Sequence, residues 1–162
     1  MAGASPIPAV AVAPGADCQR RLLMNSVAPE LVALDADTGE FCADFGVNGR
    51  VDLRAGLGKG ADKGEVYPTS APTLAGTTVV IGGRVADNVS TDMPGGVVRG
   101  FDVITGQLRW AFDPGNPDDT QAPAAGQTYV RSTPNVWAPM SYDPQSNTCL
   151  LYTSPSPRDQ RG

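Results

Sequence analysis

A short motif occurs twice in this chain and constrains its fold more than any other feature. Residues 34–39 read LDADTG and residues 101–106 read FDVITG, with 67 positions separating Asp35 from Asp102. In each copy the Asp can accept hydrogen bonds from the backbone ahead of it, and the final Gly can adopt the left-handed conformation that returns the next strand. The chain is therefore predicted to contain two copies of one strand–turn–strand unit.

Short β-branched or alternating apolar segments flank both turns and predict strands. They lie at residues 22–25, 30–35, 41–45, 77–83, 97–103 and 107–112. Segments rich in Gly, Pro and Asp predict long loops at residues 46–65, 84–96 and 114–127. No segment keeps an apolar period of 3.6, so little helix is expected. About four strands per repeat favour the blades of an all-β propeller, and two coincidental hairpins in one sandwich are the alternative.

Two large side chains have predicted structural roles in this arrangement. Trp110 follows the second turn and is expected to fill the space between adjacent sheets as an apolar plug. Arg99 is expected at the surface or between blades rather than as a cofactor ligand.

The charge and residue inventory excludes several functions. The formal net charge of −5 leaves no basic face for nucleic acid. The absence of histidine from the sequence removes Ser/His/Asp and Cys/His catalysis. A metal bound by this chain would need oxygen ligands, which suits Ca²⁺ or Mg²⁺.

The cysteines leave the redox state of the chain open. The three cysteines are Cys18, Cys42 and Cys149, and no CxxC pair suggests zinc. Cys18 and Cys42 could form a disulfide or remain two buried thiols.

Residues 1–17 contain three prolines and no Lys or Arg, which predicts a linker or loop rather than a signal peptide. No apolar run of about 18 residues predicts a membrane span in this chain.

Around the second turn the sequence resembles a known family. Residues 100–115, GFDVITGQLRWAFDPG, resemble the blade motif of the pyrroloquinoline quinone (PQQ) dehydrogenases, and most of all the membrane-bound quinoprotein glucose dehydrogenases. The other stretches that agree are residues 30–39, 67–72, 86–91 and 134–139. The blade motif alone is general to quinoproteins, whereas its combination with ADNVST and PNVWAP is more specific.

The resemblance implies a fold, a reaction and a location. Residues 18–148 would form about two blades of an eight-bladed propeller that holds PQQ and Ca²⁺ or Mg²⁺ near its axis. The parent enzyme would oxidise an aldose (glucose) to its lactone in the periplasm. It would be anchored in the bacterial inner membrane and would pass electrons to ubiquinone.

The resemblance also implies a set of site residues. The metal would be held by Asp87, Asn88 and Asn135. PQQ would contact Thr69, Ser70, Asp87, Asn88 and Trp137. Carboxylate and amide oxygens suit a hard cation acting as a Lewis acid, and a flat indole suits a planar quinone. The plainer interpretations are a turn pair at residues 87–88 and loop packing at Trp137.

Some family features are not found in this sequence. The active-site aspartate of a later blade, the cofactor-binding lysine and histidine and the membrane anchor are missing, so no catalytic residue is predicted and this polypeptide is expected to be inactive by itself. The alternatives are a quinate, shikimate or polyol dehydrogenase of the same family and a non-enzymatic propeller scaffold. A scaffold would have no need for the motifs at residues 87–88 and 135–137 together, which favours the enzyme.

The C-terminal segment departs from the family pattern. Residues 149–159, CLLYTSPSPRD, resemble one reading frame of a transposase-type sequencing adapter. We therefore expect residues 149–162 to be a non-native tail. We also expect two isolated blades to aggregate, because they expose unpaired sheet edges and an apolar face.

Overall fold

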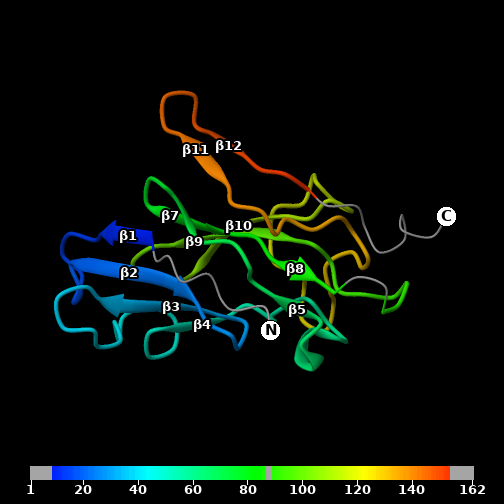
Figure 1. Ribbon diagram of the computed structural model, residues 1–162, viewed down its shortest axis with the longest axis horizontal. Helices are drawn as coiled ribbons and strands as arrows, with labels where there is room; N and C mark the ends of the chain where they lie inside the picture. The colour runs from blue at the N-terminus through cyan, green and yellow to red at the C-terminus, as the bar shows by residue number, and fades with distance from the viewer. Residues whose placement is uncertain (1–8, 87–88, 154–162) are drawn as a thin grey trace.

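The computed structural model describes residues 9–86 and 89–153, and they form a nearly all-β protein (Figure 1). The helical content of these residues is one short 3₁₀ turn, η1 (Ala61–Lys63). The prediction of an all-β chain with little helix is confirmed. None of the described segments is a helix with the length and apolar character needed to cross a membrane.

The first sheet is an antiparallel meander of four strands. Its strands, in both chain and sheet order, are β1 (Ala9–Val12), β2 (Arg20–Asn25), β3 (Glu30–Asp35) and β4 (Arg50–Asp52). Burial alternates along β2, so that Arg21, Leu23 and Asn25 point inward while Arg20 points outward. The predicted strand at residues 30–35 is confirmed, and the one at residues 22–25 begins two residues earlier.

Two predictions for this sheet are wrong. Residues 9–12, assigned to a linker or loop, form β1, because the alternating Ala-Val-Ala-Val segment pairs with β2. Residues 41–45 are not a strand: Phe41 makes a single bridge to Leu34 before the chain turns. The fourth strand is β4 instead, inside the segment predicted to be a long loop.

The second sheet is also a four-stranded meander. Its strands are β6 (Thr73–Ala75), β7 (Thr78–Ile81), β9 (Val98–Asp102) and β10 (Leu108–Phe112), in the order β10-β9-β7-β6. Every residue of β7 is buried, as its β-branched run favours. The strands predicted at residues 77–83, 97–103 and 107–112 are confirmed with slightly tighter bounds, and residues 114–127 form a strand-free loop as expected.

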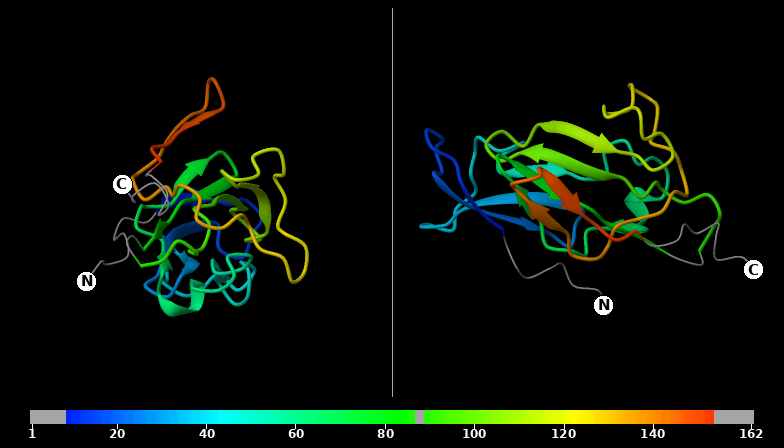
Figure 2. Two further views of the ribbon diagram at one scale, coloured as in Figure 1. Left: turned by 90° about the vertical axis from the view of Figure 1, so that its right-hand side faces the viewer. Right: turned by 90° about the horizontal axis from the view of Figure 1, so that it is seen from above.

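Two short strand pairs complete the structure. β5 (Val66–Tyr67) pairs with β8 (Arg84–Val85), and β11 (Ser141–Asp143) pairs with β12 (Thr148–Leu150). The β11–β12 hairpin stands out from the body in Figures 1 and 2. Residues 149 and 150, expected to begin a non-native tail, lie in β12, and residues 154–162 lie outside the described residues. The non-native origin of the tail stays a prediction.

The sheets are arranged in series. The main core cluster lies between the first two sheets and draws Leu23 and Leu31 from one, Val79 and Phe101 from the other, and Phe45 from the loop between β3 and β4. β6 is the first strand of the second sheet. It contacts β1, the first strand of the first sheet, and β11, the first strand of the hairpin. Successive four-stranded meanders whose first strands adjoin one another are the arrangement of propeller blades.

The repeated turns adopt the predicted geometry. Asp35 Oδ1 accepts hydrogen bonds from the N–H groups two and three residues ahead, at 2.8 and 2.9 Å. Asp102 Oδ1 does the same at 2.9 and 2.7 Å. Gly39 (φ 78°) and Gly106 (φ 70°) end the turns in the left-handed region. The sequence repeat is therefore a structural repeat.

A third copy of this turn was not recognised in the sequence. Asp143 Oδ1 accepts a hydrogen bond from the N–H of Gln145 at 3.0 Å, and Asn147 takes the left-handed position at φ 52°. Asn here replaces the Gly of the other two turns, and Asn is the residue that tolerates this conformation next best. The substitution hid the repeat.

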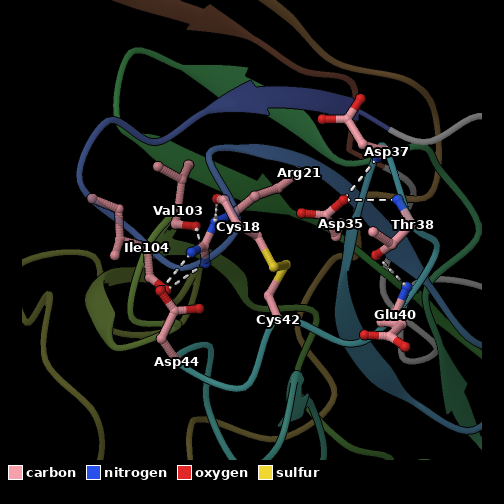
Figure 3. The surroundings of a disulfide bond; sticks show 10 residues. All are labelled: Cys18, Arg21, Asp35, Asp37, Thr38, Glu40, Cys42, Asp44, Val103 and Ile104. Atoms are coloured by element: carbon pink, nitrogen blue, oxygen red, sulfur yellow. Dashed lines mark hydrogen bonds and ion pairs between the residues drawn. A yellow bond between two sulfur atoms is a disulfide. The ribbon is translucent and has the colours of Figure 1, made fainter.

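A disulfide joins Cys18 to Cys42 and settles the alternative left open by the sequence (Figure 3). Both cysteines are buried, and their Cα atoms are 5.7 Å apart. The bond connects the loop between β1 and β2 to the segment that follows β3. It therefore holds the two ends of the first sheet's central hairpin together.

Two buried arginines join the first two sheets. Arg21 on β2 donates to the carbonyl oxygens of Val103 and Ile104 at 3.3 and 2.7 Å and pairs with Asp44 at 2.6 Å (Figure 3). Arg99 on β9 donates in the opposite direction, to carbonyl oxygens after β4, and burial lowers its pKa. The expectation that Arg99 lies between blades is confirmed.

Trp110 lies where a plug between sheets was expected. Its half-buried indole packs against Val80 and Val98 of the second sheet and against Val136 and Met140 of the segment leading to β11. The side chain therefore links the second sheet to the chain that begins the third.

Candidate functional site

Three segments that are distant in sequence meet beside the second sheet. β5 and β8 pair with Tyr67 opposite Arg84. An isolated bridge then joins Gly83 to Val136. The Thr69 hydroxyl donates to the carbonyl oxygen of Trp137 at 3.0 Å. These contacts bring together the segments at residues 66–72, 82–86 and 134–137, which include most of the stretches that resemble the PQQ dehydrogenases.

Glycines make this convergence possible. A Cβ at Gly82 would collide with the carbonyl oxygen of Val136 and one at Gly96 with that of Pro134. The backbone at residues 134–136 therefore lies directly on two positions that a side chain would block.

Burial alternates from residue 66 to residue 72 and separates two faces. Tyr67 and Thr69 are partly exposed, whereas Val66, Pro68 and Ser70 are buried. The same separation continues across the ladder, because directly opposed residues of an antiparallel pair share a face. Arg84 thus lies on the face of Tyr67 and Thr69.

Ser70 points the other way, into the protein. Its side chain is buried, and its hydroxyl has no hydrogen-bond partner among the described residues. Its carbonyl oxygen accepts a hydrogen bond from Asn25 Nδ2 at 2.7 Å, and the Asn25 side chain is fully buried. Thr69 therefore lies on the partly exposed face, whereas Ser70 joins this segment to β2 of the first sheet.

The other predicted site residues differ in their exposure to solvent and in whether the structure describes them. Trp137 exposes 46% of its surface next to the Thr69 contact, whereas Asn135 is buried. Asp87 and Asn88 lie outside the described residues. Within residues 9–86 and 89–153 no group of three or more His, Cys, Asp or Glu side chains could hold a metal. The predicted metal ligands are thus represented here by Asn135 alone.

Sequence reasoning missed two members of this site, Tyr67 and Arg84. The Arg84 guanidinium carbon lies 5.2 Å from the centre of the Tyr67 ring, and Nη1 donates to the Tyr67 hydroxyl. Tyr67 opens one stretch that resembles the family and Arg84 stands two residues before another. That placement was the available signal, but only the β5–β8 pairing shows that the two side chains touch.

A separate cavity of about 400 Å³ lies between the first two sheets and the loop at residues 122–127. Its walls include Phe101, Leu108, Arg99 and Tyr129. Burial raises the pKa of the Tyr129 hydroxyl. Thr69, Ser70, Asn135 and Trp137, the predicted site residues that the structure describes, do not line this cavity.

Fold and site together define a segment of a β-propeller in which loops of successive blades converge on one surface. The sequence of residues 3–162 matches the family described as PQQ, glucose/ethanol/alcohol dehydrogenase, beta-propeller domain. The chain belongs to this family of PQQ-dependent dehydrogenases.

Two quinate-oxidising proteins are among its relatives. The chain is 55% identical to the quinate/shikimate dehydrogenase (quinone) of Acinetobacter baylyi over 151 residues, which cover 93% of this chain and 18% of the relative. It is 58% identical to the probable quinate dehydrogenase (quinone) of Xanthomonas campestris over 154 residues, which cover 93% and 19%. The chain thus spans about a fifth of the length of these relatives.

A glucose dehydrogenase and a solved structure show more distant similarity. Quinoprotein glucose dehydrogenase A of Acinetobacter calcoaceticus is 46% identical over 126 residues, which cover 78% of this chain and 16% of the relative. The quinohemoprotein alcohol dehydrogenase of Comamonas testosteroni aligns with a TM-score of 0.60 at 20% identity, covering 91% of this chain and 21% of that structure. The structural likeness confirms the partial propeller fold.

Proposed function

We propose that this chain is part of a PQQ-dependent, quinone-linked dehydrogenase whose substrate is quinate or shikimate. The observation that carries the proposal is the identity of 55–58% to two quinate dehydrogenases over 93% of the chain. Glucose, which the sequence resemblance favoured, has less support, because the glucose dehydrogenase is 46% identical over 78% of the chain. The alternative weighed in the sequence is therefore the better proposal.

The residues present fit a planar, carboxylate-bearing cofactor. Trp137 offers an exposed indole face, Thr69 a hydroxyl on the open side of its segment, and Arg84 a guanidinium beside them. When bound, PQQ supplies the two-electron acceptor for oxidation of a secondary alcohol. The protein's part would be to hold the cofactor flat against Trp137 and to exclude water from that face.

Ser70 would act differently from the direct cofactor contact expected of it. Its buried hydroxyl and the carbonyl bond from Asn25 support a role in fixing the segment that carries Thr69. Ca²⁺ or Mg²⁺ held by Asp87, Asn88 and Asn135 remains part of the proposal. Carboxylate and amide oxygens suit such a cation.

The location of the parent protein is also proposed. We place it in the periplasm, anchored to the inner membrane and reducing ubiquinone. The Cys18–Cys42 disulfide supports an oxidising compartment, because structural disulfides persist there and are rare in the cytosol.

The test uses the complete gene recovered from its source DNA. The expressed protein is assayed for ubiquinone reduction with quinate, shikimate, glucose and glycerol, with and without PQQ and with Ca²⁺ or Mg²⁺. We expect turnover that requires PQQ and a kcat/KM for quinate or shikimate at least about tenfold above that for glucose. A preference for glucose would restore the aldose assignment. A folded protein that shows no turnover with or without PQQ would favour the scaffold.

A further inference from the structure

Arg84 differs from the other arginines of the described chain. Six of these form ion pairs with carboxylates: Arg20, Arg21, Arg50, Arg54, Arg109 and Arg131. Arg99 is buried and donates to two backbone carbonyl oxygens. Arg84 has neither kind of partner within the described residues, and it contacts the hydroxyl and ring of Tyr67. Its charge is therefore not balanced by any described residue.

The position of this guanidinium is nevertheless well defined. Arg84 lies in the β5–β8 ladder, directly opposite Tyr67, and its Nη1 donates to the Tyr67 hydroxyl. A guanidinium offers five N–H donors in a planar fork, so this bond leaves most of them available. Holding the fork against a ring lowers the entropy lost when it binds a second partner. Arg84 is thus preorganised for an anion that the described residues do not supply.

Its surroundings place that anion in the candidate site. Arg84 shares a face with Tyr67 and Thr69, and the residue before it, Gly83, bridges Val136 beside the exposed Trp137. A cation, a hydroxyl and an indole face therefore gather on one surface. The partial burial of Arg84 reduces the solvent screening of its charge.

We propose that Arg84 binds a carboxylate of the ligand in this site through its guanidinium fork, with Tyr67 holding the fork in place. The inference rests on the proposed function and makes it more specific. A planar fork matches a carboxylate by two parallel hydrogen bonds. Both quinate and shikimate carry a carboxylate, PQQ carries carboxylates as well, and glucose has none. The carboxylate can therefore come from the substrate or from the cofactor.

The experiment compares Arg84→Gln, Arg84→Lys and the matched control Arg20→Gln in the full-length protein. Arg20 pairs with Asp37 on the exposed turn of the first sheet, outside the site. Three quantities are measured: the Kd of PQQ for the apoprotein by fluorescence titration, the KM for quinate, and the KM for quinate methyl ester, which has the same ring and no charge. Circular dichroism and unfolding midpoints establish that each variant is folded.

The two sources of the carboxylate predict different results. If it belongs to the substrate, Arg84→Gln raises KM for quinate at least about tenfold and leaves the methyl ester KM and the PQQ Kd unchanged. If it belongs to the cofactor, the PQQ Kd rises by a similar factor and the ratio of the two KM values stays constant. In both cases Arg84→Lys loses less, because it keeps the charge but not the fork.

Other outcomes overturn the proposal. If Arg84→Gln matches Arg20→Gln within twofold in all three quantities, Arg84 binds no carboxylate. If Arg84→Gln does not fold, Tyr67→Phe is measured instead, because it removes only the hydroxyl that holds the fork. It must change the same binding constant or KM in the same direction by a smaller factor. If the wild-type protein has no PQQ-dependent activity, the proposed function fails. Calorimetric binding of quinate by wild type, and its loss in Arg84→Gln, then decides the role of Arg84 separately.

Discussion

The absence of a side chain at Gly100 on β9 is required by its neighbour on the next strand. It pairs with Trp110 of β10, and a Cβ at Gly100 would lie 2.5 Å from the indole Nε1. The ring therefore lies flat over a position that has no side chain. This placement lets Trp110 reach the cluster that joins the second sheet to the start of the third.

Replacing this glycine tests the contact. Gly100→Ala should destabilise the full-length protein by about 1–3 kcal/mol, because the indole must move out of a packed position. Gly83→Ala is the matched control, since its Cβ would meet no atom nearer than 3.6 Å. Denaturant unfolding measures both. Equal unfolding free energies for the two variants would show that the indole adjusts without cost.

At the scale of elements, the turn that begins at Asp102 depends on an ionised carboxylate. Burial raises the pKa of Asp102, but N–H bonds from Thr105 and Ile104 and the Arg109 side chain outweigh burial and hold the pKa below its ordinary value of 3.8. The same turn docks on the first sheet through Arg21 and through the bond from Gly46 N to Thr105 O at 2.9 Å. Its stability therefore bears on the contact between the first two sheets.

The pH dependence of this turn has a defined sign. Since the folded-state pKa is depressed, the stabilisation is present above the ordinary pKa and is lost as pH falls below about 4 through the folded-state value. Asp102→Asn should be less stable than wild type at pH 6, and its unfolding free energy should fall less between pH 5 and pH 3. Denaturant titrations at these pH values measure it. Parallel curves for both proteins would contradict the carboxylate's role.

The disulfide acts on the same scale, across 24 residues of the first sheet. Removing it in the Cys18→Ser/Cys42→Ser double variant should cost about 3 kcal/mol, because the unfolded chain regains the entropy of an open loop. Reductant should lower the unfolding midpoint of wild type and leave that of the double variant unchanged. Cys149→Ser is the control and should respond to reductant as wild type does.

For the whole molecule, the described part is an open section of a propeller. Each edge strand of the two sheets is paired on one side only. Apolar side chains such as Val10, Val12 and Leu150 are more than half exposed. Exposed edges and apolar patches favour association with other chains. The first two sheets do share a closed core, so the exposure is confined to the outer surfaces.

The isolated polypeptide of residues 1–148 should therefore aggregate or remain partly unfolded. Size-exclusion chromatography with light scattering and a thermal scan measure this directly. A soluble monomer with one cooperative transition would contradict the prediction and would mean that the shared core is sufficient for folding. The full-length protein, with its blades closed, serves as the folded reference.

Local chemistry was enough to predict much of the fold. The turns at Asp35 and Asp102 and the strands β3, β7, β9 and β10 depend on residues close together in sequence. The all-β class and the two units followed from them. The strand β1, by contrast, is short and preceded by prolines, and it forms because β2 offers it a partner. The third turn was hidden because Asn147 occupies the glycine position.

The candidate site divides in the same way. The resemblance of the sequence to the PQQ dehydrogenases predicted which stretches belong to it, including those around Thr69 and Trp137. Strand pairing in the folded chain was needed to show that Ser70 faces inward and that Cys18 and Cys42 are bonded. It was also needed to show that Arg84 lies against Tyr67 and pairs with no carboxylate of the described residues. The physical reason is that strand pairing joins residues far apart along the chain, and the register of that pairing sets which side chains share a face.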